Sequence, residues 1–428
     1  MKYSIVTFGC RVNQADSLGF EAQLLAAGAE PVPAECADVV IVNTCSVTAS
    51  ADQGARQTIR RLSRLNPSVR VVVTGCYATR ETSEVQALPN VLAVVRNDDK
   101  ARLVDVLRTP ASLGPPPSGV GHLADGPCGR PLEPGAAGRT AFTLRVQTGC
   151  GESCSYCIIP ATRGLPRSLP LSAVLAALRR AIDAGFREVV LTGVHLGSYG
   201  RDLAPQSSLH DLLLALRELA ARRQDRVLFR ISSLEPMDCT EAIVELVAGS
   251  ECFAPHFHLP LQHASTRMLQ TMRRPYDISY YAGLVSRVRS LMPHASIGSD
   301  VIAGFPGETD EDADTLASYL QQSPLTHLHV FPYSDRPGTE ASRMGDRPGG
   351  SAVKARGARL RDIGRMLTSR FIETQRGTVH RALTIDDGSV AVTGNYLKVR
   401  IPPGLPRNRW VDVRIATTAP SIVGDVIA

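Results

Sequence analysis

Three cysteines lie close together near the middle of the chain. Cys150, Cys154 and Cys157 form a C-x3-C-x2-C pattern within the stretch 147–160, directly after a strand-like run, 142–147. Three thiolates from one short loop can hold three irons of a 4Fe-4S cube and leave the fourth iron open to a small ligand. Zinc or free buried thiols are the alternatives. Zinc usually requires a fourth Cys or His at a matching spacing, and none follows nearby, so the pattern favours an iron–sulfur cluster.

Composition limits what surrounds this loop. A chain of 428 residues with 43% apolar residues allows about two to four domains. No apolar run has transmembrane length, and the first residues read as a strand without a signal-peptide cleavage pattern, which predicts a cytoplasmic protein with no membrane contact. Ten cysteines in a reducing compartment indicate metal or catalytic roles and not disulfides. The net charge of +6 suits a polyanionic partner, although an Arg-rich, Lys-poor composition can also reflect the genome.

The N-terminal third alternates strands with helices and places a cysteine after each strand. The predicted strands are 3–8, 39–43 and 69–74, and helices are expected near 15–27 and 51–65. This alternation predicts a parallel sheet, whose strand ends meet at one edge. Cys10, Cys45 and Cys76 would therefore converge as a second three-cysteine site, although each alone could be a core residue. The remaining cysteines are interpreted as core or incidental thiols: Cys36, Cys128, Cys239 and Cys252.

Three N-terminal segments resemble the radical-SAM methylthiotransferases. They are TFGCRVNQ (7–14), VNTCSVT (42–48) and VTGCYA (73–78). The resemblance implies that Cys10, Cys45 and Cys76 hold an auxiliary 4Fe-4S cluster. It also implies that the central triad holds a second 4Fe-4S cluster, whose open iron binds S-adenosyl-L-methionine (SAM). One SAM would then be the radical source and another the methyl donor, and no side chain is assigned as a catalytic acid, base or nucleophile.

From residue 140 the strand–helix alternation resumes. Six βα units are expected, with strands near 142–147, 188–192, 227–231, 256–261, 296–303 and 327–331. Six units are fewer than the eight of a closed barrel and resemble the partial (β/α)6 barrel of radical-SAM enzymes. The resemblance places SAM contacts in the loops after these strands, at Gly193, Ser233, Glu235 and Gly304. The simpler explanation for each of the four is a turn or a cap.

Other residues near the loops carry weaker predictions. Tyr156 and Ile158 are expected to shield the cluster, and His195 is interpreted as a structural histidine. Arg163 and Arg167 are expected either to meet substrate phosphates or to be solvated. The segment 262–265 departs from the Gln-Ser-Gly-Ser of the family, which puts fine specificity in doubt.

The predicted domains are 1–110 with the auxiliary cluster, a Pro/Gly-rich linker 111–138, the radical-SAM barrel 139–372 and a C-terminal domain 373–428. The last shows short β runs between Gly and Pro, which predict a small antiparallel β-barrel resembling the RNA-binding TRAM domain. Its basic residues outnumber Asp412 nearby and suit RNA phosphates: Lys398, Arg400, Arg407, Arg409 and Arg414. Tyr396 and Trp410 are expected either in the core or stacked on bases.

Three phrases point to one branch of the family. FGCRVNQA (8–15), ISSLEP (231–236) and GNYLKV (394–399) look most like the enzymes that convert N6-threonylcarbamoyladenosine, next to the tRNA anticodon, to its 2-methylthio derivative. The implied partners are tRNA and an electron donor such as flavodoxin or ferredoxin, with the enzyme as a monomer. The alternatives are methylthiolation of N6-isopentenyladenosine in tRNA, or a non-catalytic iron–sulfur RNA-binding protein.

Overall fold

The computed structural model describes residues 1–108, 133–135 and 140–427. The predicted linker 111–138 lies outside the described residues, apart from 133–135, and so does Cys128. None of the described helices is both long and apolar enough to cross a membrane.

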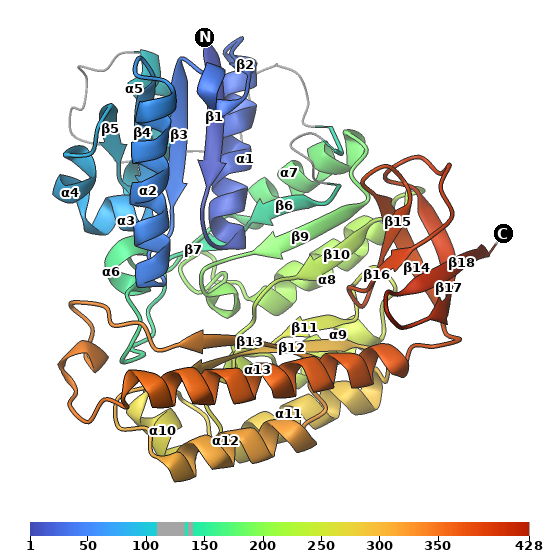
Figure 1. Cartoon of the computed structure of the whole chain (residues 1–428). Helices are drawn as coiled ribbons and strands as arrows, with labels where there is room; N and C mark the ends of the chain where they lie inside the picture. The colour runs from blue at the N-terminus through green and yellow to red at the C-terminus, as the bar shows by residue number, and fades with distance from the viewer. Residues whose placement is uncertain (109–132, 136–139, 428) are drawn as a thin grey trace.

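The N-terminal part is a five-stranded parallel sheet with helices on both faces (Figure 1). The predicted parallel sheet is confirmed, with two strands, β2 and β5, beyond the three that were predicted. The strand order is β2-β1-β3-β4-β5, with bounds β1 Lys2–Thr7, β2 Glu30–Pro31, β3 Val39–Thr44, β4 Arg70–Gly75 and β5 Val91–Val95. One core contains side chains of α1 (Arg11–Ala26) and α5 (Leu103–Arg108), and the other contains those of α2 (Ala49–Leu65) and α3 (Cys76–Arg80). Burial on both faces explains why the first four residues of β3, 39–42, are all apolar.

The central part is an open barrel of six parallel strands. Two three-stranded sheets, β6-β9-β10 and β11-β12-β13, are joined by bridges from Phe229 to Phe253 and from Ser233 to His258. The strands are β6 Phe142–Arg145, β9 Glu188–Thr192, β10 Leu228–Ile231, β11 His256–His258, β12 Ser296–Ala303 and β13 His327–Pro332. The helices that cover them are α7 Leu171–Asp183, α8 Leu209–Ala221, α9 Glu241–Ala248, α11 Ile278–Leu291 and α12 Asp310–Gln322. The partial (β/α)6 barrel is confirmed, while α9 and the short α10 (Thr266–Thr271) were not predicted.

The long helix α13 (Gly350–Glu373) lies along β13 and leads into a closed five-stranded barrel (Figure 1). Its order is β14-β15-β16-β18-β17, with bounds β14 Val379–Ile385, β15 Val390–Thr393, β16 Lys398–Arg400, β17 Trp410–Thr417 and β18 Val423–Ile427. The predicted small barrel is confirmed. Tyr396 and Trp410 lie outside its buried core, because both are turned toward the central domain.

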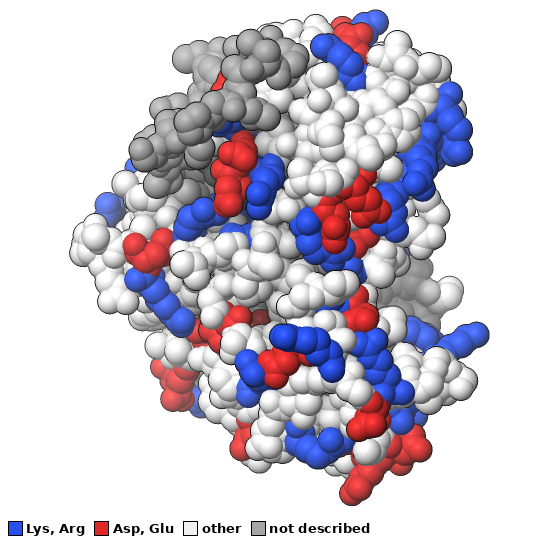
Figure 2. Space-filling view, turned by 90° about the vertical axis from the view of Figure 1, so that its left-hand side faces the viewer, with Lys and Arg blue, Asp and Glu red and all other residues white. Residues whose placement is uncertain are grey.

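Charge on the face in Figure 2 is mixed. Lys and Arg lie there in several groups, most of them beside Asp or Glu. The positive excess of the chain is therefore not concentrated on this face.

Candidate functional site

The three N-terminal cysteines follow β1, β3 and β4 and lie at one edge of the sheet, as predicted. Gly9 precedes Cys10 with φ +91°, and a Cβ on Gly9 would lie 2.5 Å from Cys45 Cβ. Gly75 precedes Cys76 with φ +98°, and a Cβ there would lie 2.1 Å from the carbonyl oxygen of Thr44. Two glycines thus let neighbouring strand ends approach closely enough to bring the thiols together.

The protonation of these thiols fits a metal cluster. Cys45 and Cys76 are buried and Cys10 is exposed. Burial, together with the nearby Cys10 and Cys76, raises the pKa of Cys45 to about 12. Burial also opposes ionisation of Cys76, but Arg163 and Lys100 outweigh it and lower the pKa of that thiol. A bound metal would supply the remaining positive charge that the thiolates need.

The spacing of the thiols argues against a single zinc ion at either triad. Two thiolates on one tetrahedral zinc lie about 3.8 Å apart, given Zn–S bonds of about 2.3 Å. Among the described residues, the His, Cys, Asp and Glu ligand atoms that lie within 4.8 Å of one another in a group of three belong to His258, Asp300 and His329. Neither cysteine triad is that compact, and the wider spacing suits a cube.

The central triad lies on the loop between β7 (Gln147–Thr148) and α6 (Ile159–Arg163). Gly149, with φ +78°, anchors this loop, because a Cβ there would lie 1.9 Å from the carbonyl oxygen of Leu165. Arg274 donates from Nη1 to Cys154 Sγ at 3.2 Å. Burial raises the pKa of Cys157 to about 12, so this thiol also needs a metal to ionise.

The flanking side chains are apolar and largely buried. Tyr156 packs edge-on against Phe305, with ring centroids 6.2 Å apart, and Ile158 is buried. Shielding of the cluster by these side chains remains a prediction.

Each of the four predicted SAM contacts lies against a different part of the protein in the structure. Glu235 forms an ion pair with Arg274 and is thereby connected to Cys154. Gly193 lies against Gln147, since a Cβ there would be 3.0 Å from Gln147 Oε1.

Ser233 and Gly304 already have protein partners. Ser233 Oγ lies 3.1 Å from His258 Nδ1. Gly304 donates its N–H to Glu308 Oε2 at 2.6 Å, and its lack of a side chain leaves room for Val353 of α13, because a Cβ there would lie 2.4 Å from Val353 Cγ2. All four residues remain predicted SAM contacts.

His195 is buried and bonded, as expected of a structural histidine. Its Nε2 lies 2.7 Å from Asp238 Oδ2, and its Nδ1 lies 3.8 Å from Cys150 Sγ. Burial lowers the pKa of His195, but Asp238 and Cys150 outweigh burial and raise it to about 10. His195 is therefore a cationic neighbour of the central triad, which the sequence did not reveal because Asp238 is remote in the chain.

The prediction that Arg163 is solvated or meets substrate phosphates is wrong. Arg163 is buried, and it donates from Nε to Cys76 Sγ at 3.4 Å and from Nη1 to Asp16 Oδ2 at 3.2 Å. The buried carboxylate of Asp16 needs cations, and Lys100 and Arg145 pair with it as well. Arg163 follows the central loop in sequence and touches the N-terminal triad in space, so it connects the two sites.

Arg167, by contrast, is exposed and pairs with Asp98 at 2.8 Å. Its role toward substrate phosphates remains a prediction.

The unusual segment 262–265 forms buried side-chain hydrogen bonds within the protein. His263 is fully buried, with Nε2 3.2 Å from Glu308 Oε1, and Ser265 donates to Asp312 Oδ1 at 2.6 Å. The side chains of His263 and Ser265 thus bond to the start of α12.

Histidines fill part of the barrel interior. His258 and His327 have ring centroids 6.3 Å apart, and His327 and His329 have centroids 5.6 Å apart. Gly298 makes room for this, because a Cβ there would lie 2.0 Å from His327 Nε2. His256 extends the stack toward Tyr396, with ring centroids 5.2 Å apart.

This stack predicts acid sensitivity. Burial, with the neighbouring His258 and His329, lowers the pKa of His327 from 6.5 to about 4. Between these values the unfolded chain binds the extra proton, so stability is full above pH 6.5 and falls as the pH drops toward 4. We expect His327 to account for about 2–3 kcal/mol of this loss. In urea denaturation at pH 7 and pH 4.5, His327→Gln should lose less stability than wild type, and His210→Gln should lose the same. Equal losses in all three would contradict the assignment.

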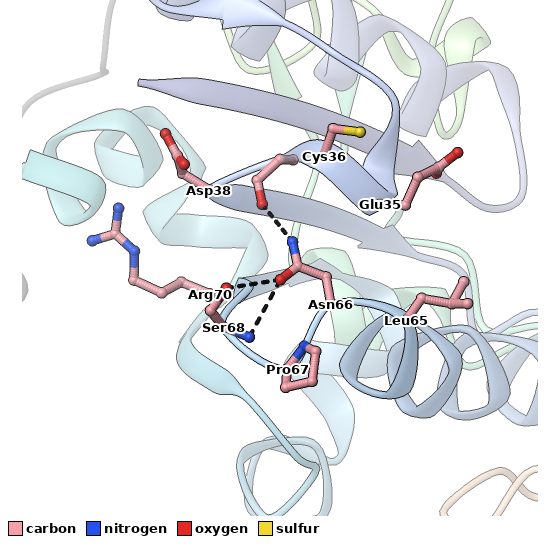
Figure 3. A pocket seen from close by; sticks show the side chains of 9 residues that line it. Glu35, Cys36, Asp38, Leu65, Asn66, Pro67, Ser68 and Arg70 are labelled. Carbon is pink, nitrogen blue, oxygen red and sulfur yellow. Dashed lines mark hydrogen bonds between the residues drawn. The ribbon is translucent and has the colours of Figure 1, made fainter.

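The pocket in Figure 3 lies away from both triads. It has a volume of about 550 Å³ and is lined by residues around the first residues of β3 and β4, among them Cys36, Asp38, Asn66 and Arg70. The pocket thus lies where these strands begin, whereas Cys45 and Cys76 follow the residues where they end. Neither Cys36 nor this pocket belongs to the candidate site.

Comparisons with known proteins agree with this geometry. A family described as "Uncharacterized protein family UPF0004" matches residues 2–96, and the radical SAM superfamily matches residues 144–320. A solved radical S-adenosylmethionine methyltransferase, TsrM from Kitasatospora setae, superposes with a TM-score of 0.57 at 14% identity, covering 80% of this chain and 77% of that one. This likeness supports the fold alone.

Sequence relatives are closer. Threonylcarbamoyladenosine tRNA methylthiotransferase MtaB of Bacillus subtilis is 33% identical over 92% of this chain and 88% of its own length. The protein of the same name from Aquifex aeolicus is 35% identical over 94% of this chain and 96% of its own length. The tRNA-2-methylthio-N(6)-dimethylallyladenosine synthase of Paenarthrobacter aurescens is 32% identical over 84% of this chain and 69% of its own.

The open barrel with its three-cysteine loop defines the radical SAM class, which implies SAM and a 4Fe-4S cluster. Within that class the chain belongs to the radical SAM methylthiotransferase family, in its MtaB group. The family resemblance recognised in the sequence is thereby confirmed.

Proposed function

We propose that this protein converts N6-threonylcarbamoyladenosine in tRNA, next to the anticodon, to its 2-methylthio derivative. The observation that carries the proposal is the pairing of two cysteine triads, connected through Arg163, in a chain that matches MtaB relatives over nearly their whole length. Methylthiolation of N6-isopentenyladenosine is the alternative, supported by a relative of which less is covered.

Each cysteine triad would hold one of the two clusters. Cys150, Cys154 and Cys157 would hold the cluster that binds SAM, and Cys10, Cys45 and Cys76 would hold a second 4Fe-4S cluster. When bound, these groups supply a SAM-derived radical and a methylated sulfur for insertion at an unactivated carbon. Gly193, Ser233, Glu235 and Gly304 are the proposed SAM contacts.

The chain's own residues hold and shield these groups. Arg274 pairs with Glu235 and donates to Cys154, so it neutralises charge beside the central triad. Arg163 does the same for Cys76. Tyr156 packs against Phe305 beside the loop, and Ile158 is buried next to it in sequence, so these side chains would help to exclude water from reactive species.

The proposed partners are tRNA and a one-electron donor such as flavodoxin or ferredoxin, with the enzyme as a cytoplasmic monomer. Basic side chains exposed on the C-terminal barrel suit the phosphates of tRNA, among them Lys398, Arg400, Arg409 and Arg414.

The proposed function can be tested in a strain that lacks the gene. Mass spectrometry of its tRNA nucleosides should show loss of the 2-methylthio derivative and retention of unmodified N6-threonylcarbamoyladenosine. Loss of methylthio-isopentenyladenosine would instead favour the alternative, and an unchanged profile would reject both.

Arg163 offers a further prediction. Arg163→Met removes the donor to Cys76 Sγ, while Lys100 and Arg145 still neutralise Asp16. Loss of such a partner beside a metal ligand typically costs about 10- to 100-fold in metal affinity or activity. Methylthio transfer to tRNA should fall by that factor, with SAM cleavage retained. Arg287→Met, which removes only exposed ion pairs with Glu241 and Glu245 on the outer helices, should behave as wild type. An Arg163→Met enzyme with full transfer activity would contradict the assignment.

A further inference from the structure

A hydrogen-bonded network crosses the second half of the barrel. His258 Nδ1 lies 3.1 Å from Ser233 Oγ, and His258 Nε2 lies 3.0 Å from Asp300 Oδ1. The same oxygen of Asp300 lies 3.1 Å from His329 Nδ1. The network therefore runs from the end of β10 through β11 and β12 to β13.

His329 is the exposed end of this network. Along β13, Leu328 and Val330 pack against the hydrophobic core, so His327 and His329 point to the opposite, interior face. The side chain of His329 is 57% exposed, against 14% for His258. Its Nδ1 is oriented by Asp300, and its Nε2 has no hydrogen-bond partner among the described residues. A fixed imidazole thus presents one free nitrogen to the open interior.

Both ends of this network are connected along the chain to residues near the candidate cluster sites. Ser233, at the other end of the network, is two residues before Glu235, which pairs with Arg274 beside Cys154. Beyond His329, the chain reaches the N-terminal domain, where Ser334 accepts from the N–H of Ala49, the first residue of α2. The network is thus connected, through short stretches of chain, to contacts beside both the central and the N-terminal triads.

Charge makes His329 suited to an anion. The hydrogen bond that His329 Nδ1 donates to the Asp300 carboxylate raises the pKa of His329 above its usual value. Burial lowers the pKa of the neighbouring His327 and His256, which stay neutral, and Arg230 is already paired with Glu188. Among these groups, His329 is the one whose pKa is raised and whose ring keeps a nitrogen free for a ligand.

A metal ion is the alternative to an anion as the ligand of His258, Asp300 and His329, because their ligand atoms lie within 4.8 Å of one another. Both imidazoles, however, meet the same Asp300 oxygen at hydrogen-bond distance. The carboxylate thus sits between the rings, and the network is satisfied without a cation.

We propose that His329, oriented by Asp300, binds the carboxylate of the threonylcarbamoyl group of the substrate nucleoside. This inference rests on the proposed function. The substituent is on C6 of adenine, which flanks N1 together with the reacting C2, so a contact to the substituent also orients C2. His329 is then a specificity-determining residue that selects an acidic substituent, and Asp300 is a positioning residue.

The test uses reconstituted holoenzyme and two anticodon stem-loop RNAs. One carries N6-threonylcarbamoyladenosine, and the other carries its methyl ester, which removes the negative charge. Wild type should prefer the acid by about 10- to 100-fold in kcat/KM, as expected for a hydrogen bond to a charged group. His329→Gln and Asp300→Asn should each lower kcat/KM for the acid by that factor, through KM, and should lower it far less for the uncharged ester. His210→Gln, on the outer helix α8, should keep the wild-type preference.

The other outcomes are distinct. An equal loss on both RNAs, or an unaltered preference in both variants, would overturn the role of His329. One equivalent of zinc or manganese, bound by wild type and lost in His329→Gln, would overturn it in favour of a metal site. SAM cleavage without RNA reports whether a variant retains its central site. If wild type leaves the acid RNA unmodified, the proposed function itself fails.

Discussion

Cys45→Ser is expected to abolish methylthio transfer to tRNA while SAM cleavage continues. Cys45 is buried at the end of β3, beside Cys10 and Cys76, and a serine hydroxyl is a poor iron ligand in place of a thiolate. The central triad belongs to a separate loop and keeps its own ligands. Formation of 5′-deoxyadenosine should therefore remain near the wild-type rate, and the methylthio nucleoside should fall to background.

Two further variants sharpen this comparison. Cys157→Ser should abolish both SAM cleavage and transfer. Cys36→Ser, an exposed thiol at the far edge of the same sheet, should affect neither. If Cys45→Ser retained substantial transfer, or lost both activities together, the assignment of SAM cleavage to the central triad and of methylthio transfer to the N-terminal triad would be refuted.

Gly75→Ala is expected to disrupt the N-terminal domain. Gly75 has φ +98° and ψ −170°, a conformation that is essentially restricted to glycine, and an added Cβ would meet backbone atoms of Thr44 at 2.1 and 2.6 Å. The conformational cost of about 1–3 kcal/mol and the overlap together should reach about 4 kcal/mol or more. Hydrogen exchange should show lost protection along β3 and β4, and the N-terminal triad should lose its iron.

Gly28→Ala separates the two contributions. Gly28 lies in the same domain with φ +75°, but nothing lies within 4 Å of a Cβ built on it. Only the conformational cost should remain, about 1 kcal/mol. If Gly75→Ala were no more disruptive than Gly28→Ala, the close approach of Gly75 to Thr44 would not be what holds Cys76 in place.

Local patterns in the sequence predicted the larger architecture well. The apolar runs in β3 and β4 are buried on both faces of the sheet. A run of that kind predicts a strand from the local sequence alone, without knowledge of the neighbouring strands. The weaker elements were missed for a local reason. β18 contains Gly424 and Asp425, both unfavourable in strands, and forms only because β16 and β17 provide pairing partners.

The candidate site was predictable where its residues follow strands. The cysteines stand in short motifs, so their convergence followed from the parallel sheet. Arg163 was misjudged because its partner Asp16 lies 147 residues earlier, and no local pattern indicates a buried carboxylate there. The network that ends at His329 was missed for the same reason, since its members come from different strands.

The most direct test of the central claim is the iron and acid-labile sulfide content of anaerobically reconstituted protein, measured with its triad variants. Two 4Fe-4S clusters require about eight irons and eight sulfides per chain, and Cys45→Ser or Cys157→Ser should each retain about four. A wild-type content of about four, with Cys45→Ser unchanged, would mean that the N-terminal thiols hold no cluster and would contradict the account.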